Sequence, residues 1–435
     1  GIPTNSWSSC SRPALFNNSV EMQTSPSSQQ THSPGPLQGC RVLDFGWVLA
    51  GAIPGMVLAD MGAQVIKVES RHRLDYMRQG RPIVGDKMDP EQQPMFHNVN
   101  RSKLSVTLNT THPEAAELAR RLAAQCDVVI ENFSPGVMGR MGLGYEDLRR
   151  HKPDLIMASV SSHGQSGPLR DLRAYAPSIG AMAGLDSTLG YEGDRPLGLK
   201  HAYADICGAL HVVFAIVAAM YRRRRTGQGC YIDLSMLKAT VASTGAGLME
   251  YVMAGRVMQP KGNYDPTLAP HGNYPCRGVD RWVSIAVGTN QEWDGLVDAM
   301  DRPQWTKDPR FASLYQRLKH RDELDQHVSA WTRSMTAEAI TETLQSQGVA
   351  AVPVMDAEER LLDPHFRERE LYSEVEHPSL GSEPIFNLMW KLSRTPPAIR
   401  GHAPLLGQHN QNVLGGILGM SQEEVGRLEE GQVLW

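Results

Sequence analysis

Short apolar runs alternate with amphipathic segments along residues 40–162. The apolar runs are rich in Val and Ile and are bounded by polar stretches, which is typical of buried strands. Between them lie helix-like segments such as 112–126, where apolar residues recur every three or four positions. Near-continuous apolar strands separated by helices indicate a parallel sheet covered on both faces, so we expect an α/β doubly wound core. The runs are RVLDFG (41–46), AQVIKVE (63–69), KLSVTL (103–108), DVVIENF (127–133) and DLIMASVSS (154–162).

The pattern changes after a long apolar helix that we expect near 206–225. The glycines of RTGQG end that helix, and a less regular region of strands and helices follows. We therefore expect a second, smaller α/β domain. The expected organisation is a tail or linker at 1–36, the first part of the large domain at 37–235, a linker at 236–264, the small domain at 265–375, and a return linker with the C-terminal part of the large domain at 376–435.

The first 36 residues differ from the rest of the chain. They are rich in Ser, Gln, Asn, Thr and Pro, and they lack the basic start and apolar centre of a secretory signal. We expect a disordered tail or linker there. Because the chain begins with Gly rather than Met, it is open whether it is a processed product, one piece of a longer fusion or one subunit of a larger assembly.

Composition narrows the class of protein. The 435 residues exceed the length of about 250–300 residues at which a single core stops growing. The 43 basic and 47 acidic residues give a net charge of −4, which argues against binding to nucleic acid or to a membrane surface. The six cysteines form no CxxC pair, so a reducing, cytoplasmic setting fits. The longest apolar stretch, 209–220, contains His211 and is followed by four arginines, which favours a buried helix over a membrane span.

Several common motifs for catalysis and cofactor binding do not occur. GWVLAGAIPG (46–55) lies between a strand and a helix, yet it matches neither G-x-G-x-x-G nor the P-loop pattern. A dinucleotide cofactor is therefore disfavoured, although free amides at the helix start can still hold an anion. The histidines show no metal-ligand spacing such as HExxH, and there is no GxSxG elbow. We expect no metal and no tightly bound cofactor.

One carboxylate stands at the start of the long apolar helix. In HAYADICGALHVVF (201–214), Asp205 comes directly before the apolar run, and Asp is a preferred N-cap residue. Helix capping is therefore the plain structural interpretation. A carboxylate at a helix N-terminus is also held in its ionised form by the local amides, and an anionic carboxylate can attack a carbonyl carbon. Both roles are open on this evidence.

Several ordered motifs resemble the class III CoA-transferases, a family that also contains the α-methylacyl-CoA racemases. They include NRSKLSVTL, DVVIENFSPGVMGRMGLGYEDL, HAYADICGAL and RRTGQGCYIDLSM, and the match extends over about residues 38–425. The resemblance implies a large doubly wound domain, a smaller α/β domain, and two identical chains interlocked as rings. It also implies that Asp205 is the nucleophile, which takes the acyl group of a donor acyl-CoA as a mixed anhydride and then carries CoA as a thioester. CoA thioesters and carboxylic acids would be the substrates.

The same resemblance places the CoA contacts on the large domain. Arg140 has the clearest chemical reason, because a guanidinium forks onto phosphate oxygens. Arg173 and Tyr175 are expected to line the thioester pocket. The family's glycine-rich lid is not obvious in this chain, and Gly272 in APHGNYPCRG is the nearest candidate. The remaining positions that match CoA contacts are Ala50, Arg71, Lys103, Asn109, Asn132 and Phe133.

Three functions fit such a chain. A racemase of this family has a His-Asp pair in the segment where this chain has Tyr175 and Ala176, so one proton-transfer group of a two-base mechanism is missing. This favours a transferase over a racemase. The third hypothesis is a CoA-binding, non-catalytic half of a fused or two-subunit transferase, and the presence of Asp205 argues against it.

Overall fold

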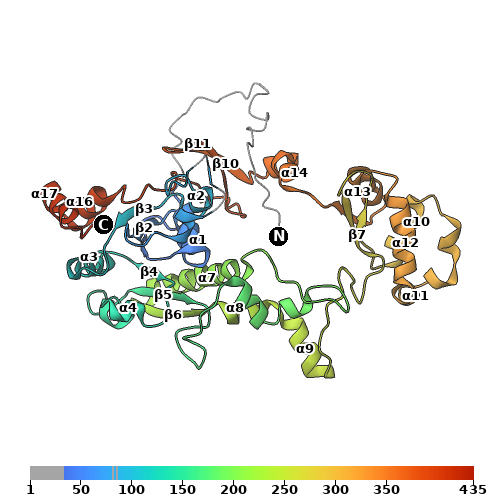
Figure 1. The fold of residues 1–435 in the computed structure, drawn as a ribbon, viewed down its shortest axis with the longest axis horizontal. Helices are drawn as coiled ribbons and strands as arrows, with labels where there is room; N and C mark the ends of the chain where they lie inside the picture. The colour runs from blue at the N-terminus through green and yellow to red at the C-terminus, as the bar shows by residue number, and fades with distance from the viewer. Residues whose placement is uncertain (1–33, 81–82, 85–86) are drawn as a thin grey trace, which may run out of the picture.

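The computed structural model describes residues 34–80, 83–84 and 87–435. The expected N-terminal tail therefore lies almost entirely outside the described residues. Within them the chain forms a large and a small folded domain, joined by two connections that follow separate paths (Figure 1).

The large domain is built on a six-stranded parallel sheet with strand order β3-β2-β1-β4-β5-β6. The predicted parallel sheet is thus confirmed, and its first five strands coincide with the five apolar runs of the sequence. The strand order reverses between β1 and β4, so the loops that leave these strands diverge and open a crevice at the carboxyl edge. The strands are β1 (Arg41–Asp44), β2 (Gln64–Glu69), β3 (Leu104–Thr107), β4 (Val128–Glu131), β5 (Ile156–Ser161) and β6 (Cys230–Ser235).

Helices cover both faces of this sheet, because alternate residues of each strand point to opposite sides. In β4, Val129 packs into one buried cluster, whereas Val128 and Ile130 pack into the other. The first cluster is covered by α3 (Pro113–Ala124), α4 (Val137–Arg140), α5 (Tyr145–Leu148), α16 (Asn410–Leu418) and α17 (Gln422–Glu430). The second is covered by α1 (Val48–Asp60), α2 (Pro94–Asn100), α6 (Ala176–Met182), α7 (Tyr203–Thr226) and α8 (Met236–Ser243).

The small domain has its own core, in which a three-stranded antiparallel sheet packs against four helices. Aromatic and branched side chains such as Trp293, Phe311 and Ile340 fill this core and are almost fully buried. Its elements are β7 (His271–Pro275), β8 (Trp282–Ala286), β9 (Ala350–Pro353), α10 (Asn290–Ala299), α11 (Leu314–Lys319), α12 (Arg321–Thr332) and α13 (Ala337–Ser346).

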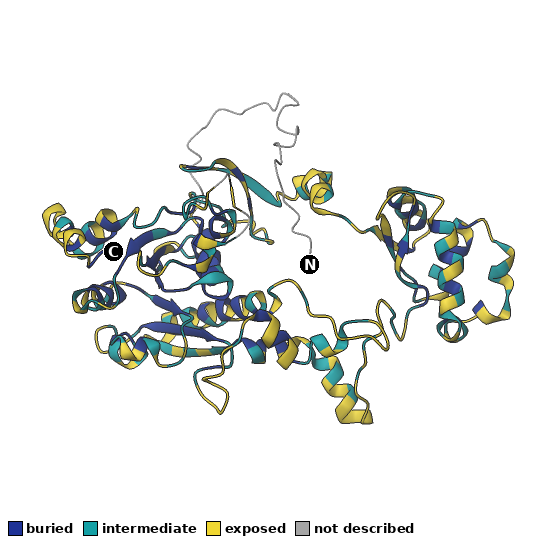
Figure 2. Ribbon diagram, in the orientation of Figure 1, coloured by how far each residue is buried: buried dark blue, intermediate teal, exposed yellow. Residues whose placement is uncertain are grey.

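Two connections link the domains. The outgoing one contains α9 (Gly245–Ala254), in which no residue is buried and which stands out as exposed in Figure 2. The returning one contains α14 (Ala357–Leu362), α15 (Pro364–Glu368) and a hairpin of β10 (Tyr372–His377) and β11 (Gly381–Phe386). Short 3₁₀ turns complete the described chain: η2 (Tyr76–Gln79), η3 (Asp186–Thr188), η4 (Gln304–Lys307) and η5 (Pro309–Phe311).

A pair of stacked histidines fastens the returning hairpin to α2. His97 Nδ1 lies 2.8 Å from Glu383 Oε1, and its Nε2 lies 3.1 Å from the carbonyl oxygen of Glu91. Both nitrogens of the His97 ring thus face oxygen acceptors, which fixes the ring beside the hairpin. The His377 ring stacks on it with centroids 3.8 Å apart, and its Nε2 faces the carbonyl oxygen of Ala403. Burial first, and then the neighbouring imidazole of His97, lower the pKa of His377 to about 4, so its ring is neutral at pH 7.

Helix α7 is the long apolar helix of the sequence. By length and composition it is the one helix of the described residues that meets the criteria for a membrane span, with a mean hydropathy of 1.8. It packs against α1 and α8, and residues such as Val212, Val213 and Ile216 are buried in the large-domain core. A core helix passes the same criteria, so the finding is weak evidence for a span.

Candidate active site

Asp205 lies at the carboxyl edge of the large sheet. Helix α7 leads into β6, which is parallel to β5, so the helix must run from the carboxyl edge back to the opposite edge. Its first turn therefore shares that edge with the loops that follow β1, β4 and β5. In open α/β sheets this is the edge at which ligands bind.

The prediction that Asp205 caps α7 is wrong. The helix begins at Tyr203 with Ala202 in the N-cap position and no side-chain cap, which places Asp205 inside the first turn. Burial alone raises the pKa of its carboxyl to about 6, and no hydrogen bond or charge from the described residues opposes that rise. The carboxylate is thus more basic than an ordinary Asp and still mainly ionised at pH 7.

The surroundings of Asp205 leave it open to a ligand. One turn along α7, Gly208 lies so close to the Met236 side chain that an added Cβ would fall 2.8 Å from Met236 Cγ. This close approach fixes the start of α7 against the start of α8. Tyr175, at the N-cap position of α6, is 75% exposed, and Arg173 is also exposed. Neither is bound to a described side chain, so both are free to meet a substrate.

The loop after β1 holds a strained residue at the crevice. Val48 begins α1 with φ of 54°, a left-handed conformation that is rare for a β-branched side chain. Asp75 Oδ1 accepts a hydrogen bond from its N–H at 3.1 Å and thereby holds it there. Asn132, after β4, bridges the crevice by accepting from Trp47 N and donating to Trp47 O, both at 2.9 Å. Backbone strain of this kind is typical of ligand-binding sites.

The predicted CoA contacts fall into two groups. Asn132 uses both ends of its amide on Trp47, and Ala50 is buried in α1, so these two shape the crevice. Phe133 packs its ring edge-on against Trp47 at 6.2 Å. On the surface, Arg140 makes no ion pair within the described residues, which leaves its guanidinium available to an anion.

Two further predicted contacts lie close to the C-terminal end of the chain. Arg71 donates to the carbonyl oxygen of Leu406 at 3.2 Å and lies over the Trp435 ring. Asn109 donates to the carbonyl oxygen of Gln432 at 3.3 Å. Both are exposed enough to reach a ligand as well, so they stay predictions.

Lys103 has a structural role in place of the predicted CoA contact. Its ammonium donates to Asp44 Oδ2 at 2.8 Å, to the carbonyl oxygen of Ala52 at 2.8 Å and to Asn100 Oδ1 at 3.0 Å. These three bonds use all its protons, and the side chain is completely buried. Burial lowers the pKa of Lys103 to about 8. A buried lysine with no free proton has nothing to offer a phosphate.

Two polar features of this edge escaped the sequence analysis. Glu131 ends β4 almost fully buried, and burial raises the pKa of its carboxyl to about 7. It accepts a hydrogen bond from Phe133 N at 2.7 Å but faces no cation among the described residues. The second feature is the loop Ser161–Gln165 after β5. The signal for both was visible as polar residues at the end of a buried strand, a position that points to the carboxyl edge.

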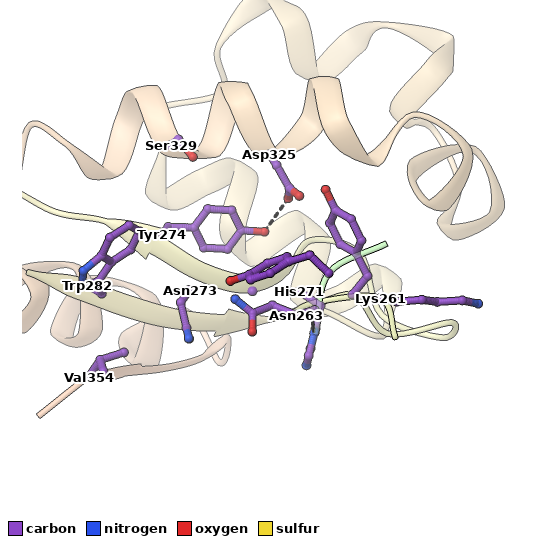
Figure 3. A pocket seen from close by; sticks show the side chains of 12 residues that line it. Lys261, Asn263, His271, Asn273, Tyr274, Trp282, Asp325, Ser329 and Val354 are labelled. Atoms are coloured by element: carbon purple, nitrogen blue, oxygen red, sulfur yellow. Dashed lines mark hydrogen bonds between the residues drawn. The ribbon is translucent and has the colours of Figure 1, made fainter. Parts of the chain in front are cut away.

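A cleft of about 470 Å³ lies beside β7 and α12 of the small domain, and residues of the outgoing connection such as Lys261 and Asn263 also line it (Figure 3). On one wall Tyr274 donates to Asp325 Oδ1 at 2.6 Å. Lys261, Asn263 and His271 also line the cleft, and the Lys261 side chain extends away from the other two (Figure 3). Within the described residues no ion pair engages Lys261. The volume suits a small organic molecule.

The predicted lid residue is part of this cleft. Gly272 lies within strand β7, where it pairs with Ile285 of β8. A residue inside a three-stranded sheet cannot open and close over a substrate, so Gly272 is not a lid. Over the residues that the structure covers, no group of three or more His, Cys, Asp or Glu side chains is placed to hold a metal ion.

Comparison with known proteins gives one consistent match. A family model described as CoA-transferase family III matches residues 37–410. A succinyl-CoA–D-citramalate CoA-transferase of Chloroflexus aurantiacus is 33% identical over 92% of this chain and 98% of its own length. The beta subunit of a succinyl-CoA–L-malate CoA-transferase from the same organism is 31% identical, with the same two coverages. The crystal structure of a CAIB/BAIF family protein from Brucella suis superposes with a TM-score of 0.81 at 29% identity, over 88% of this chain and all of that one.

Proposed function

The chain belongs to CoA-transferase family III, and we propose that it moves CoA from succinyl-CoA to a dicarboxylic acid through covalent intermediates on Asp205. The observation that carries the proposal is the state of Asp205. It is a carboxylate in the first turn of a helix at the ligand-binding edge, with a pKa raised by burial alone. Such a group is ionised and basic enough to attack a thioester.

The chemistry needs four displacements, each a simple exchange at an acyl carbon. Asp205 attacks the thioester carbonyl, the C–S bond breaks, and CoA thiolate leaves behind a mixed anhydride. The thiolate attacks the Asp205 acyl carbon and releases the donor acid, which gives an aspartyl-CoA thioester. The acceptor carboxylate attacks that thioester and releases the thiolate again. The thiolate then attacks the acceptor's acyl carbon, which forms the new acyl-CoA and frees Asp205.

The acid partners are inferred from the relatives. Those reported above are named for succinyl-CoA as donor and for a hydroxylated dicarboxylic acid as acceptor. The small-domain cleft supports a similar acceptor here, because Lys261 and His271 offer a cation and an imidazole beside two polar amides. A Lys261→Ala variant should raise KM for the acid severalfold and leave KM for succinyl-CoA unchanged. Lys307→Ala, in the small domain, is the control; equal KM values for the acid in both variants would remove the cleft from the proposal.

We also propose that two chains interlock, because the cleft and Asp205 belong to different domains of one chain. Exposed apolar side chains support this, among them Phe214 on α7 and Val252 and Met253 on α9. Large apolar groups left in water mark interaction surfaces. Light scattering should give twice the chain mass of 48.0 kDa. A monomeric particle that transfers CoA would refute the interlocked pair.

The racemase alternative loses support at Tyr175 and Ala176. Tyr175 is largely exposed and Ala176 is buried in the large-domain core, so no acid–base pair stands at this point of the chain. The subunit alternative has one specific observation in its favour, since the malate relative is itself a beta subunit.

A direct assay separates these functions. The purified chain is incubated with succinyl-CoA and, one at a time, malate, citramalate, mesaconate and glutarate, and new CoA thioesters are followed by mass spectrometry. Hydroxylamine then traps the acyl intermediate, which should appear on the peptide that contains Asp205. Transfer without any adduct at Asp205 would refute the covalent mechanism. Proton exchange of a 2-methylacyl-CoA in heavy water without transfer would establish the racemase.

A further inference from the structure

The loop after β5 concentrates unpartnered polar groups. Over the described residues, six buried side-chain nitrogen or oxygen atoms have no hydrogen-bond partner. Three of them fall within five consecutive residues: Ser161 Oγ, His163 Nε2 and Gln165 Nε2. Buried polar atoms are almost always hydrogen-bonded in folded proteins, because losing water without gaining a partner is unfavourable. A cluster of exceptions therefore calls for a ligand that completes the bonds.

The backbone of this loop is firmly held. The carbonyl oxygen of Ser162 accepts from Leu237 N at 2.9 Å, and Gln165 N donates to Asp233 Oδ1 at 2.8 Å. Gly164 sits between them with φ of 94°, a conformation that suits glycine. The unpartnered atoms thus stand on a fixed frame, so a ligand meets groups that are already oriented.

The loop and Asp205 meet the same short element. Leu237, which binds the loop, is the second residue of α8, and Met236, its first, packs on Gly208 one turn after Asp205. The loop also leaves the carboxyl end of β5, the edge at which α7 begins. Contacts through α8 and the direction of the strands therefore bring both to one region of the large domain.

The free atoms can serve an oxygen ligand. Gln165 presents amide protons, and the hydroxyl of Ser161 presents one more. Ser161 is only 5% exposed. His163 Nδ1 lies 3.0 Å from Ser162 Oγ and 3.2 Å from the carbonyl oxygen of Leu172, which ties the loop to the segment before Tyr175. Donors of this kind are what an acyl oxygen requires as negative charge develops on it.

We propose that Gln165 and Ser161 bind the acyl oxygen of the thioester and anhydride at Asp205 and stabilise the oxyanion formed at each displacement. His163 is a positioning residue that anchors the loop through Leu172. This inference rests on the proposed CoA transfer, for which no oxyanion donor has otherwise been identified.

The test uses Gln165→Met and Ser161→Ala in the full chain, with kcat, KM and the melting temperature measured for each. Gln165→Met should lower kcat about 10²–10³-fold and change KM for succinyl-CoA less than threefold. Both variants should also raise the melting temperature of the free protein by about 1–2 °C, because each removes a buried group without a partner. Gln228→Met is the matched control, since Gln228 is exposed and bound to Arg222.

The values of kcat and the melting temperature together distinguish binding of the acyl oxygen from a purely structural role of the loop. A kcat within threefold of the parent overturns the proposal, and so does a lowered melting temperature, because it shows that water or protein already completes these bonds. If the parent chain transfers no CoA, the proposed function fails instead. The melting temperatures then still decide whether the loop holds unpartnered groups.

Discussion

The two halves of the carboxyl edge treat buried charge in opposite ways. Beside β1–β3, Lys103 and Asp44 form a closed pair in which the ammonium has no free proton. Lys67 Nζ likewise donates to the carbonyl oxygen of Gly46 at 2.6 Å. Beside β4–β6, Glu131 and Asp205 face no cation among the described residues. One half thus pairs its buried charges with charges of opposite sign, whereas the other half leaves two carboxyl groups without a cation and with raised pKa values.

The largest expected effect comes from Asp205→Asn. We expect transfer to fall at least about 10³-fold, because an amide cannot form the anhydride. The melting temperature should rise, since the native carboxyl has a pKa above that of the unfolded chain and is therefore held ionised at a cost at pH 7. Circular dichroism and the transfer assay report the two quantities. Retained transfer would contradict the role of Asp205.

Lys103→Met tests the half of the edge beside β1–β3, where the buried charges are paired. It leaves Asp44 buried and unpaired, so we expect the free energy of unfolding in urea to fall by about 3–5 kcal/mol. The folded fraction should bind CoA as tightly as the parent. Lys307→Met, at an exposed lysine of the small domain, is the matched control and should hardly change stability. A stable Lys103→Met protein with weakened CoA binding would restore the CoA contact that the sequence predicted.

The stacked histidines give a stability prediction for a third region. Burial first, and then the charges of His97 and His402, lower the pKa of His377 to about 4, against the opposing charge of Glu383. The unfolded chain binds the proton more readily, so stability is lost as the pH falls from about 6.5 to 4. We expect a loss of about 2–3 kcal/mol. His377→Gln should flatten this dependence in urea titrations; an unchanged slope would show that His377 is not its source.

The smallest expected effect is the pH dependence of activity. With the pKa of Asp205 raised to about 6, kcat/KM should fall about tenfold for each pH unit below 6 as the nucleophile becomes protonated. Rates from pH 5 to 8 measure this limb, and circular dichroism at each pH shows whether the chain stays folded, because the His377 effect on stability falls within the same range. A profile that is flat down to pH 5 would mean that contacts with the substrate return the pKa of the Asp205 carboxyl to its ordinary range.

The sequence predicted the sheet because strand burial leaves a direct record in apolar runs. The runs 41–46 and 154–162 contain the whole of β1 and β5 and extend beyond them by two and three residues. The mistaken cap at Asp205 has a physical reason: a first-turn Asp and an N-cap Asp precede the same apolar stretch, and only the backbone angles distinguish them.

Lys103 shows why the roles of the site residues could not all be predicted from the sequence. The position of Lys103 in a motif does not reveal that its ammonium donates a hydrogen bond to Asp44, which lies 59 residues earlier in the chain. The unpartnered atoms of Ser161 and Gln165 were beyond the sequence for the same reason, since a missing partner is a property of the packed fold. Types of residue can be read from a chain, whereas their pairing requires coordinates.

The path of the chain through the large domain also constrains how the protein is made. One face of the sheet is completed by Val413, Leu414, Val425 and Leu428, which lie among the last residues of the sequence. The small domain, by contrast, takes its core from the continuous stretch 269–351. During synthesis the small domain has all its core residues first, while the earlier strands wait with apolar surface uncovered. A ribosome stalled near residue 400 would therefore carry a folded small domain on an unfinished large one, which makes this interval the one in which chaperones matter most.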